Sequence, residues 1–299
     1  MKWLPDGALD HLREVASEPD LAGTPYEIAG IIGQGGMGTV YLARDRDLDR
    51  EVALKVVQLH QEDTERMLRE ARILARLEHP GVVPVHDVGV LPDGRAWYVM
   101  KRVRGSRLDE HARSLSLPDR LRAFERICEA VAFAHAHGVI HRDLKPENVM
   151  VGPFGEVLVM DWGVAKLRGE GEAHGTVLGT PGYMAPEQER GEVERIDERA
   201  DVYALGAILS FLLQGEEQIP RPLAAIRSRA MAAEPDGRYP NVRELSADLG
   251  FYLDGLPVAA YRESLVEQAA RLFRRYRAPI LIVLAYLLMR ALLILILGR

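Results

Sequence analysis

The chain has 299 residues, of which 47% are apolar and 27% charged, and a formal net charge of −6 at pH 7. This composition excludes a disordered chain and allows a large folded core. Because Cys128 is the single cysteine, an intrachain disulfide is excluded, which is typical of a protein in a reducing compartment. Its apolar neighbours indicate that Cys128 is buried. Residues 256–299 contain seven Arg and two Glu, so residues 1–255 are strongly acidic. This distribution argues against a nucleic-acid partner and favours a membrane near the basic tail.

The first half of the chain has strand-like patterns. Residues 1–23 are polar and have no apolar run, so we expect an N-terminal extension without a signal peptide. From Tyr26, YEIAGIIGQGGMGTVYLARD and REVALKVV predict strands around a glycine-rich turn. The segment ERMLREARILARLEH predicts a helix, and VVPVHDVGV and RAWYVMKRV predict two more strands.

Helical periodicity dominates after Gly105. PDRLRAFERICEAVAFAHAHG predicts a helix that stops at Gly138, and DVYALGAILSFLLQG predicts a buried helix closed by Gly215. We expect two further helices at about 222–233 and 241–253. A strand-rich first part and a helix-rich second part predict an α+β protein with two lobes.

The run from Gly33 to Val40 has the pattern G-x-G-x-x-G-x-V, in which glycines let backbone N–H groups approach phosphate oxygens. A tight hairpin turn is the alternative. A strand ending at Lys55 follows, not a helix, which favours a glycine-rich flap over a nucleotide. The long side chain of Lys55 needs a carboxylate to hold it in place. Glu70 suits this role better than Glu65, because Glu70 lies on the apolar side of the next helix. An exposed pair worth under about 1 kcal/mol is the alternative.

The segment IHRDLKPENVM places Asp143, Lys145 and Asn148 in one loop. These residues supply a proton acceptor, a cation and an oxygen ligand for Mg²⁺. Asp161 follows in VMDWGVAK, where an ordinary turn aspartate is the alternative to a metal ligand. Two oxygen ligands and two cations, Lys55 and Lys145, are what phosphoryl transfer requires.

Together these segments resemble the eukaryotic-like (Hanks-type) protein kinase family. GQGGMGTV, VALK, HRDLKPEN, DWG, GTPGYMAPE and DVYALG occur in the family's order from about Tyr26 to Leu253. The resemblance implies a bilobal kinase fold, with a β-rich N-lobe at 24–103 and an α-helical C-lobe at 104–255. HRDLKPEN, together with Thr180 before APE, looks like a Ser/Thr and not a Tyr kinase. With LDGLPVAAYRES before the apolar tail, the chain resembles bacterial membrane-anchored Ser/Thr kinases, which implies transfer of the γ-phosphoryl group of ATP to protein substrates and to itself.

The resemblance also implies roles for single residues. Asp143 is the catalytic base and Lys145 the cation for the γ-phosphate, while Asn148 and Asp161 bind Mg²⁺, with Mn²⁺ as an alternative. Met100 resembles the gatekeeper, and Lys101 to Val103 the hinge that meets adenine. The remaining implied ATP contacts are Ile32, Gly33, Gln34, Gly35, Gly36, Met37, Gly38, Thr39, Val40, Ala53 and Lys55, the last fixed by Glu70.

Other implied roles are structural or regulatory. Glu187 pairs with Arg238, Asp201 steadies the HRD loop, and Thr180 contacts the base and Lys145. Arg142 implies control by phosphorylation of the activation loop, because an arginine beside the base can receive a phosphate. Thr176 is the expected phosphosite, with a plain solvated threonine as the alternative.

Two features depart from the family pattern. Trp162 stands where many members have Phe, and it can still pack on the helix that carries Glu70. Only 50 residues separate Glu187 from Arg238, so the family's helix after Gly215, which docks substrates or partners, is largely missing.

The tail ends in PILIVLAYLLMRALLILIL, 19 residues with one charge, which is about enough to cross a hydrocarbon core of roughly 30 Å. Arg290 costs about 2.5–3.5 kcal/mol at mid-span, which thirteen Leu, Ile and Val residues and snorkelling offset; pairing with a partner's acidic residue is the alternative. We expect a basic juxtamembrane segment at 256–277 and a single transmembrane helix at 278–298 in the cytoplasmic (inner) membrane, with the kinase in the cytoplasm. A buried helix or an apolar contact in a homodimer is the alternative.

Three functions fit these motifs: an active Ser/Thr kinase, a catalytically silent kinase-fold membrane scaffold, and a small-molecule phosphotransferase. Intact Lys55, Asp143, Asn148 and Asp161 favour the active kinase. GTPGYMAPE resembles a peptide-positioning loop and disfavours the small-molecule enzyme.

Overall fold

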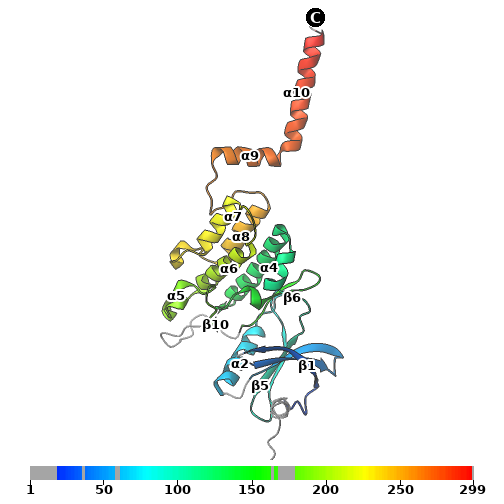
Figure 1. The fold of residues 1–299 in the computed structure, drawn as a ribbon, viewed down its shortest axis with the longest axis vertical. Coiled ribbons are helices and arrows are strands. Elements are labelled where there is room, and N and C mark those ends of the chain that lie inside the picture. The colour runs from blue at the N-terminus through cyan, green and yellow to red at the C-terminus, as the bar shows by residue number, and fades with distance from the viewer. Residues whose placement is uncertain (1–18, 36–37, 58–60, 163–164, 168–178, 298–299) are drawn as a thin grey trace, which may run out of the picture.

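The computed structural model describes residues 19–35, 38–57, 61–162, 165–167 and 179–297. Figure 1 shows a lobe of strands, a lobe of helices and a pair of C-terminal helices that extends from the second lobe. The predicted α+β architecture with two lobes is therefore confirmed.

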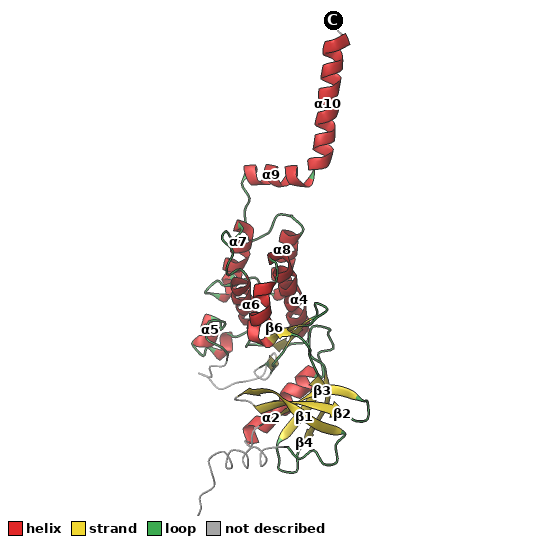
Figure 2. Ribbon diagram, turned by 45° about the vertical axis from the view of Figure 1, so that its right-hand side comes forward, coloured by secondary structure: helices red, strands yellow, loops and turns green. Residues whose placement is uncertain are grey.

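The first lobe is built on a five-stranded antiparallel sheet with the order β1-β2-β3-β5-β4. Its elements are β1 (Tyr26–Gly35), β2 (Gly38–Asp45), β3 (Arg50–Val56), α2 (Gln61–Leu74), β4 (Val85–Val90) and β5 (Ala96–Lys101). Helix α2 packs against β4 and β5 through residues at helical spacing, such as Met67, Ala71 and Leu74 (Figure 2).

The alternation of side chains along β3 decides which residues reach the second lobe. Leu54 points into a small apolar cluster on the outer face of the sheet, whereas Ala53 joins the main core. Lys55 lies on the same face as Ala53, opposite Val40 on β2 and Tyr98 on β5. Residues from three strands thus meet where the two lobes face each other.

The glycine-rich run forms the end of the β1–β2 hairpin, in which Gly35 is paired with Gly38. Gly38 has φ 136°, and a Cβ added there would lie 2.2 Å from the backbone oxygen of Val56. Only glycine fits this close approach of β2 to β3.

The second lobe is mainly helical. Its helices are α3 (Leu108–His111), α4 (Leu117–Ala136), α5 (Pro186–Glu189), α6 (Glu198–Leu212), α7 (Arg221–Ala230) and α8 (Val242–Leu253), with 3-10 turns at 112–114, 146–148, 193–195 and 235–237. Its short strands are β6 (Ser106–Arg107), β7 (Val139–Ile140), β8 (Val149–Val151), β9 (Val157–Val159) and β10 (Lys166–Leu167). Strand β8 lies between β6 and β9, and β7 pairs with β10. These pairings bring the loop at 141–145 close to the residues that follow β9.

Capping residues set where the central helices begin and end. Ser116 Oγ accepts a hydrogen bond from the N–H of Asp119 at the start of α4, and the chain leaves this helix at Gly138 with φ 75°. Asp197 caps α6 in the same way. Cys128 lies on the buried side of α4. Residues 213–220 alone connect α6 to α7, and the structure has no helix among them.

Two helices follow the second lobe, α9 (Leu265–Arg275) and α10 (Arg277–Leu297). In both ribbon views α9 lies crosswise to α10, and α10 extends away from the lobes (Figures 1 and 2). In the part of the chain whose side chains are described, which leaves out much of both ends of α10, no helix is long and apolar enough to cross a membrane.

Candidate active site

Lys55 extends from β3 to the carboxylate of Glu70 on α2. Its Nζ lies 3.1 Å from Oε1 and 3.0 Å from Oε2 of Glu70. The Glu70 side chain is 4% exposed and that of Lys55 12%, so this is not the surface ion pair considered as the alternative. Glu65, on the same helix, is exposed to solvent. A buried, doubly bonded carboxylate fixes the long lysine side chain in one position.

Tyr98 on β5 also bonds to Glu70, and the sequence motifs did not indicate this residue. Its hydroxyl donates to Glu70 Oε1 at 2.9 Å, and Lys55 Nζ lies 5.6 Å from the centre of its ring. Tyr98 is fully buried, and a buried tyrosine hydroxyl needs a hydrogen-bond partner. The signal available in the sequence was the place of this tyrosine in the apolar run AWYVM. All five residues of that run are buried in β5.

The surroundings of Lys55 favour its charged form. Burial disfavours the ammonium, but the neighbouring Tyr98, Glu70 and Asp161 outweigh burial, and the pKa of Lys55 is raised above its ordinary value. Asp161 Oδ1 lies 3.7 Å from Lys55 Nζ. Lys55 is thus a fixed positive charge beside two carboxylates, suited to binding phosphate oxygens between the lobes.

Asp143, Lys145 and Thr180 form a second cluster in the second lobe. Thr180 Oγ1 donates to Asp143 Oδ1 at 2.7 Å, and Lys145 Nζ donates to Thr180 Oγ1 at 2.7 Å. Lys145 Nζ also lies 3.2 Å from Asp143 Oδ2. All three residues are partly exposed, so a ligand can reach them. The cluster presents a proton acceptor and a cation at one place.

Asn148 and Asp161 lie on two segments that backbone pairing brings together, because the Met160 N–H donates to the Asn148 carbonyl at 2.8 Å. Asn148 Nδ2 donates to the backbone oxygen of Asp143 at 2.9 Å, which ties the amide to the loop at 141–145. Asp161 Oδ1 is buried and has no hydrogen-bond partner among the described residues. Lys55 Nζ, at 3.7 Å, is a cation close to this oxygen but too far away to bond to it, and the Asp161 side chain is 39% exposed, so a metal ion can reach the carboxylate.

These two residues fit Mg²⁺. This ion prefers oxygen ligands and uses one or two protein side chains together with substrate phosphates. The described residues hold no cluster of three or more His, Cys, Asp or Glu that could bind a metal by itself. Two oxygen-bearing side chains, Asn148 and Asp161, suit a site that phosphate oxygens complete.

The loop at 141–145 is held in place by Asp201 on α6. Its carboxylate accepts hydrogen bonds from the N–H groups of His141 and Arg142, both at 2.8 Å, and lies 2.7 Å from His135 Nε2. Burial works against the charge of Asp201, but its hydrogen bonds and the neighbouring His135 and His141 outweigh burial, and the pKa of Asp201 is lowered. His135, on α4, was not indicated by the sequence motifs.

Two residues of the site adopt left-handed backbone conformations that residues other than glycine rarely adopt. Arg142 has φ 68° and Asp161 has φ 56°. Each costs about 1–3 kcal/mol and persists where the surroundings enforce it. Gln188 helps by donating to the Arg142 carbonyl at 3.0 Å. Trp162, buried after Asp161, packs its ring 4.5 Å from that of His141.

Glu187 and Arg238 form a doubly bonded pair inside the second lobe. Both distances, Nη1 to Oε1 and Nη2 to Oε2, are 2.7 Å, and the two side chains are 1% and 0% exposed. Arg238 also donates to backbone oxygens of Ala232, Ala233 and Arg199. The pair joins α5 to the segment before α8.

The remaining predicted ATP contacts lie on the N-lobe sheet and the hinge. Met100 is buried in the main core beside Ala53, and Val103 packs against that core. Val40 and Thr39 are partly buried on β2, whereas Ile32 is exposed on β1. Gly33, Gln34 and Gly35 end β1, and Gly38 begins β2. Gly36, Met37 and the predicted phosphosite Thr176 lie outside the described residues.

Comparison with known families decides the assignment. The family model described as "protein kinase domain" matches residues 26–249, which is most of the chain. The chain belongs to the protein kinase family. The kinase fold implied by the motifs is thereby confirmed.

The curated proteins described next, which are similar to this chain, are named serine/threonine-protein kinases. A serine/threonine-protein kinase PknD of Protochlamydia amoebophila is 32% identical over 77% of this chain and 30% of its own length. A protein of the same name from Chlamydia trachomatis serovar D is 34% identical over 86% of this chain and 34% of its own length, and one from Chlamydia caviae is 36% identical over 78% and 31%. The chain spans about a third of the length of these relatives. Their names agree with the Ser/Thr type that the motifs implied.

Proposed function

We propose that this chain is a serine/threonine protein kinase that transfers the γ-phosphoryl group of Mg-ATP to hydroxyl groups of proteins. The observation that carries the proposal is that the Lys55–Glu70 pair and the Asp143–Lys145–Thr180 cluster are assembled in the same structure. Both the phosphate-binding half and the hydroxyl-activating half of a phosphoryl-transfer site are therefore formed.

The residues divide the reaction between them. Asp143 accepts the proton of the incoming hydroxyl as its oxygen bonds to the γ-phosphorus, and the bond from that phosphorus to the β–γ bridging oxygen breaks to release ADP. Lys145 offsets negative charge on the transferring group, and Lys55 orients the other phosphates. Mg²⁺ or Mn²⁺, held by Asn148 and Asp161, neutralises charge on the phosphates when bound.

The N-lobe supplies the nucleotide pocket in this proposal. The glycine-rich hairpin covers the phosphates, and adenine lies against Ala53, Met100 and Val103 with the hinge backbone at 101–103. We also propose autophosphorylation at Thr176, with Arg142 receiving the phosphate. The support for these assignments is the family resemblance together with the positions of the described residues.

We further propose that α10 anchors the kinase in the cytoplasmic membrane, with both lobes in the cytoplasm. Support comes from the apolar sequence Pro279–Leu297 and from residues 281–289, which are apolar and exposed on every side of the helix. A helix that is apolar all round needs an apolar environment. A homodimer that buries α10 is the alternative, and the basic residues before α10 favour the membrane.

The test is to reconstitute the full chain in lipid nanodiscs, add Mg-ATP and a generic basic protein, and map phosphosites by mass spectrometry. The matched control is Asp143→Asn. We expect phosphate on the chain and on the added protein, and none with the control. Absence of transfer by the unmodified chain would favour the kinase-fold scaffold, for which the short α6–α7 link is the main support. Phosphate on other residues but not on Thr176 would reject the phosphosite alone.

A further inference from the structure

Helix α9 separates apolar from polar residues along its length. Leu265, Val266, Ala269 and Phe273 recur at the spacing of one helical side, i, i+1, i+4 and i+8. Glu267, Gln268 and Arg271 share the same spacing on the other side. Such strict separation in a helix outside the folded lobes indicates a boundary between water and an apolar phase.

The polar side of α9 is tied to the segment that precedes it. Glu267 accepts hydrogen bonds from the Tyr261 hydroxyl at 2.9 Å and from the Ser264 N–H at 2.8 Å, and Ser264 caps the helix in return. Gln268 donates to the Glu263 carbonyl, and Arg271 Nε lies 3.0 Å from Glu263 Oε2. The polar side therefore faces back along the chain toward the second lobe.

That preceding segment is itself fastened to the second lobe. Asp248, buried on α8, accepts the Tyr239 hydroxyl at 2.7 Å and the Ala260 N–H at 3.0 Å. Val258 is buried, and Tyr261 packs against the main core. An ion pair between Arg221 on α7 and Glu267 links the lobe to α9 directly. The orientation of α9 about its own axis is thus set by the C-lobe.

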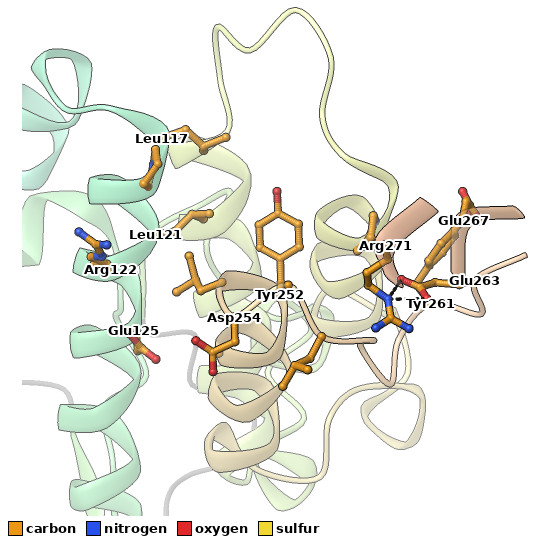
Figure 3. Close-up of a pocket in the computed structure, with 16 residues that line it drawn as sticks. Leu117, Leu121, Arg122, Glu125, Tyr252, Asp254, Tyr261, Glu263, Glu267 and Arg271 are labelled. Atoms are coloured by element: carbon orange, nitrogen blue, oxygen red, sulfur yellow. Dashed lines mark hydrogen bonds and ion pairs between the residues drawn. The ribbon is translucent and has the colours of Figure 1, made fainter. Parts of the chain in front are cut away.

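A cavity of about 890 Å³ lies between this polar side and the lobe. Figure 3 shows Leu121 and Glu125 from α4 on one wall, Tyr252 from α8 in the middle, and Glu267 and Arg271 from α9 on the opposite wall. Polar groups of α9 line this cavity, so the apolar side of the helix is turned away from the protein.

The apolar side of α9 has no cover among the described residues. Leu265 is 82% exposed, Val266 79% and Phe273 52%. We propose that this side of α9 is inserted into the interface of an anionic lipid bilayer. In this arrangement α9 lies along the membrane, and the end of the C-lobe nearest α9 rests on the membrane surface. The inference deepens the proposed membrane anchoring, on which it rests for the direction of α10.

Two observations favour a bilayer over a second copy of the chain. Arg271, Arg274, Arg275 and Arg277 give this segment a positive charge that complements anionic headgroups and would repel an identical segment. The helix that follows, α10, is also apolar and exposed at residues 281–289. In this position the N-lobe lies at the far end of the molecule from the membrane (Figures 1 and 2).

The test uses the full chain with Cys128→Ala as background and one new cysteine, Val266→Cys on the apolar side or Gln268→Cys as the matched polar control. Each is labelled with an environment-sensitive fluorophore and bound to vesicles of phosphatidylcholine and phosphatidylglycerol. We expect a blue-shifted emission and about threefold weaker iodide quenching at position 266 than at 268. Equal quenching at both positions would overturn the proposal, as would shielding at 266 that depends on protein concentration and not on lipid.

Carbonate extraction separates this inference from the proposed anchor. Resistance to carbonate together with equal quenching would keep α10 as an anchor and reject the role of α9. Shielding at position 266 in a chain that carbonate removes would support α9 and reject the transmembrane assignment. Val266→Glu should weaken the blue shift of a label at Ala269→Cys while leaving peptide phosphorylation in detergent unchanged, which excludes a general folding defect.

Discussion

Tyr98 and Glu70 are joined by a buried hydrogen bond of 2.9 Å, from the tyrosine hydroxyl to the carboxylate that also holds Lys55. The bond links β5, which leads into the hinge, to α2, which carries the glutamate. A shift of α2 away from the sheet would break it and leave two buried polar groups without partners.

We therefore expect Tyr98→Phe to weaken the active arrangement of Glu70. Loss of a hydrogen bond to a charged group corresponds to about 1–2 kcal/mol here, or about a 5- to 30-fold fall in kcat/KM. Steady-state kinetics would measure it, with Glu70→Leu, which has no acceptor for the hydroxyl, and the double variant completing a cycle. If Tyr98→Phe costs as much in the Glu70→Leu background as in the native chain, the hydroxyl acts elsewhere.

Asp161→Asn should strongly reduce catalysis while preserving the fold. Asparagine tolerates the left-handed backbone at φ 56° but lacks the charge, so we expect a loss of about 10²–10³-fold in kcat. The free energy of unfolding should change by less than about 1 kcal/mol. Asp161→Val is the matched contrast, because a β-branched residue is strained in this conformation. Activity of Asp161→Asn close to that of the native chain would remove Asp161 from the metal site.

Arg238→Met should destabilise the C-lobe. It leaves the Glu187 carboxylate buried without its partner, which costs about 3–5 kcal/mol in the free energy of unfolding. Urea denaturation would measure the loss. Adding Glu187→Leu should restore part of the stability, and only part, because the hydrogen bonds from Arg238 to the backbone oxygens of Ala232 and Ala233 stay lost. A single variant as stable as the native chain would mean that solvent reaches this pair.

The thiol of Cys128 should be inert in the native state. Burial raises its pKa above the ordinary value, and the thiolate is the reactive form. Because the unfolded thiol ionises at lower pH than the native one, this group favours folding below its ordinary pKa and loses that contribution as the pH rises above it. Labelling with a disulfide reagent at neutral and mildly alkaline pH, with and without denaturant, would show rapid reaction only after unfolding. Fast labelling of the native chain would contradict the burial.

The sequence predicted which residues of the candidate site lie together, because short motifs place several polar groups on one loop or strand. HRDLKPEN carries Asp143, Lys145 and Asn148, and the period of β3 and α2 was enough to select Glu70 over Glu65. Tyr98, His135 and Gln188 were missed. Each acts through one hydrogen bond to a residue at least 28 positions away, and no local pattern encodes such a contact.

In the C-terminal tail, by contrast, the sequence did not predict how the helices are arranged. Hydropathy indicated a basic segment before an apolar helix, but it did not indicate that α9 is separate from α10 or that its polar side is bonded to the C-lobe. That arrangement depends on Asp248 accepting backbone N–H groups eleven and twelve residues away, which composition cannot reveal.

The left-handed backbone at Asp161 has one more consequence. Since asparagine fits this conformation nearly as well as aspartate, an active kinase and a stable, silent version of the same protein are separated by one substitution. The silent version would keep the Lys55–Glu70 pair, the Asp201 support and the surface it shows to partners.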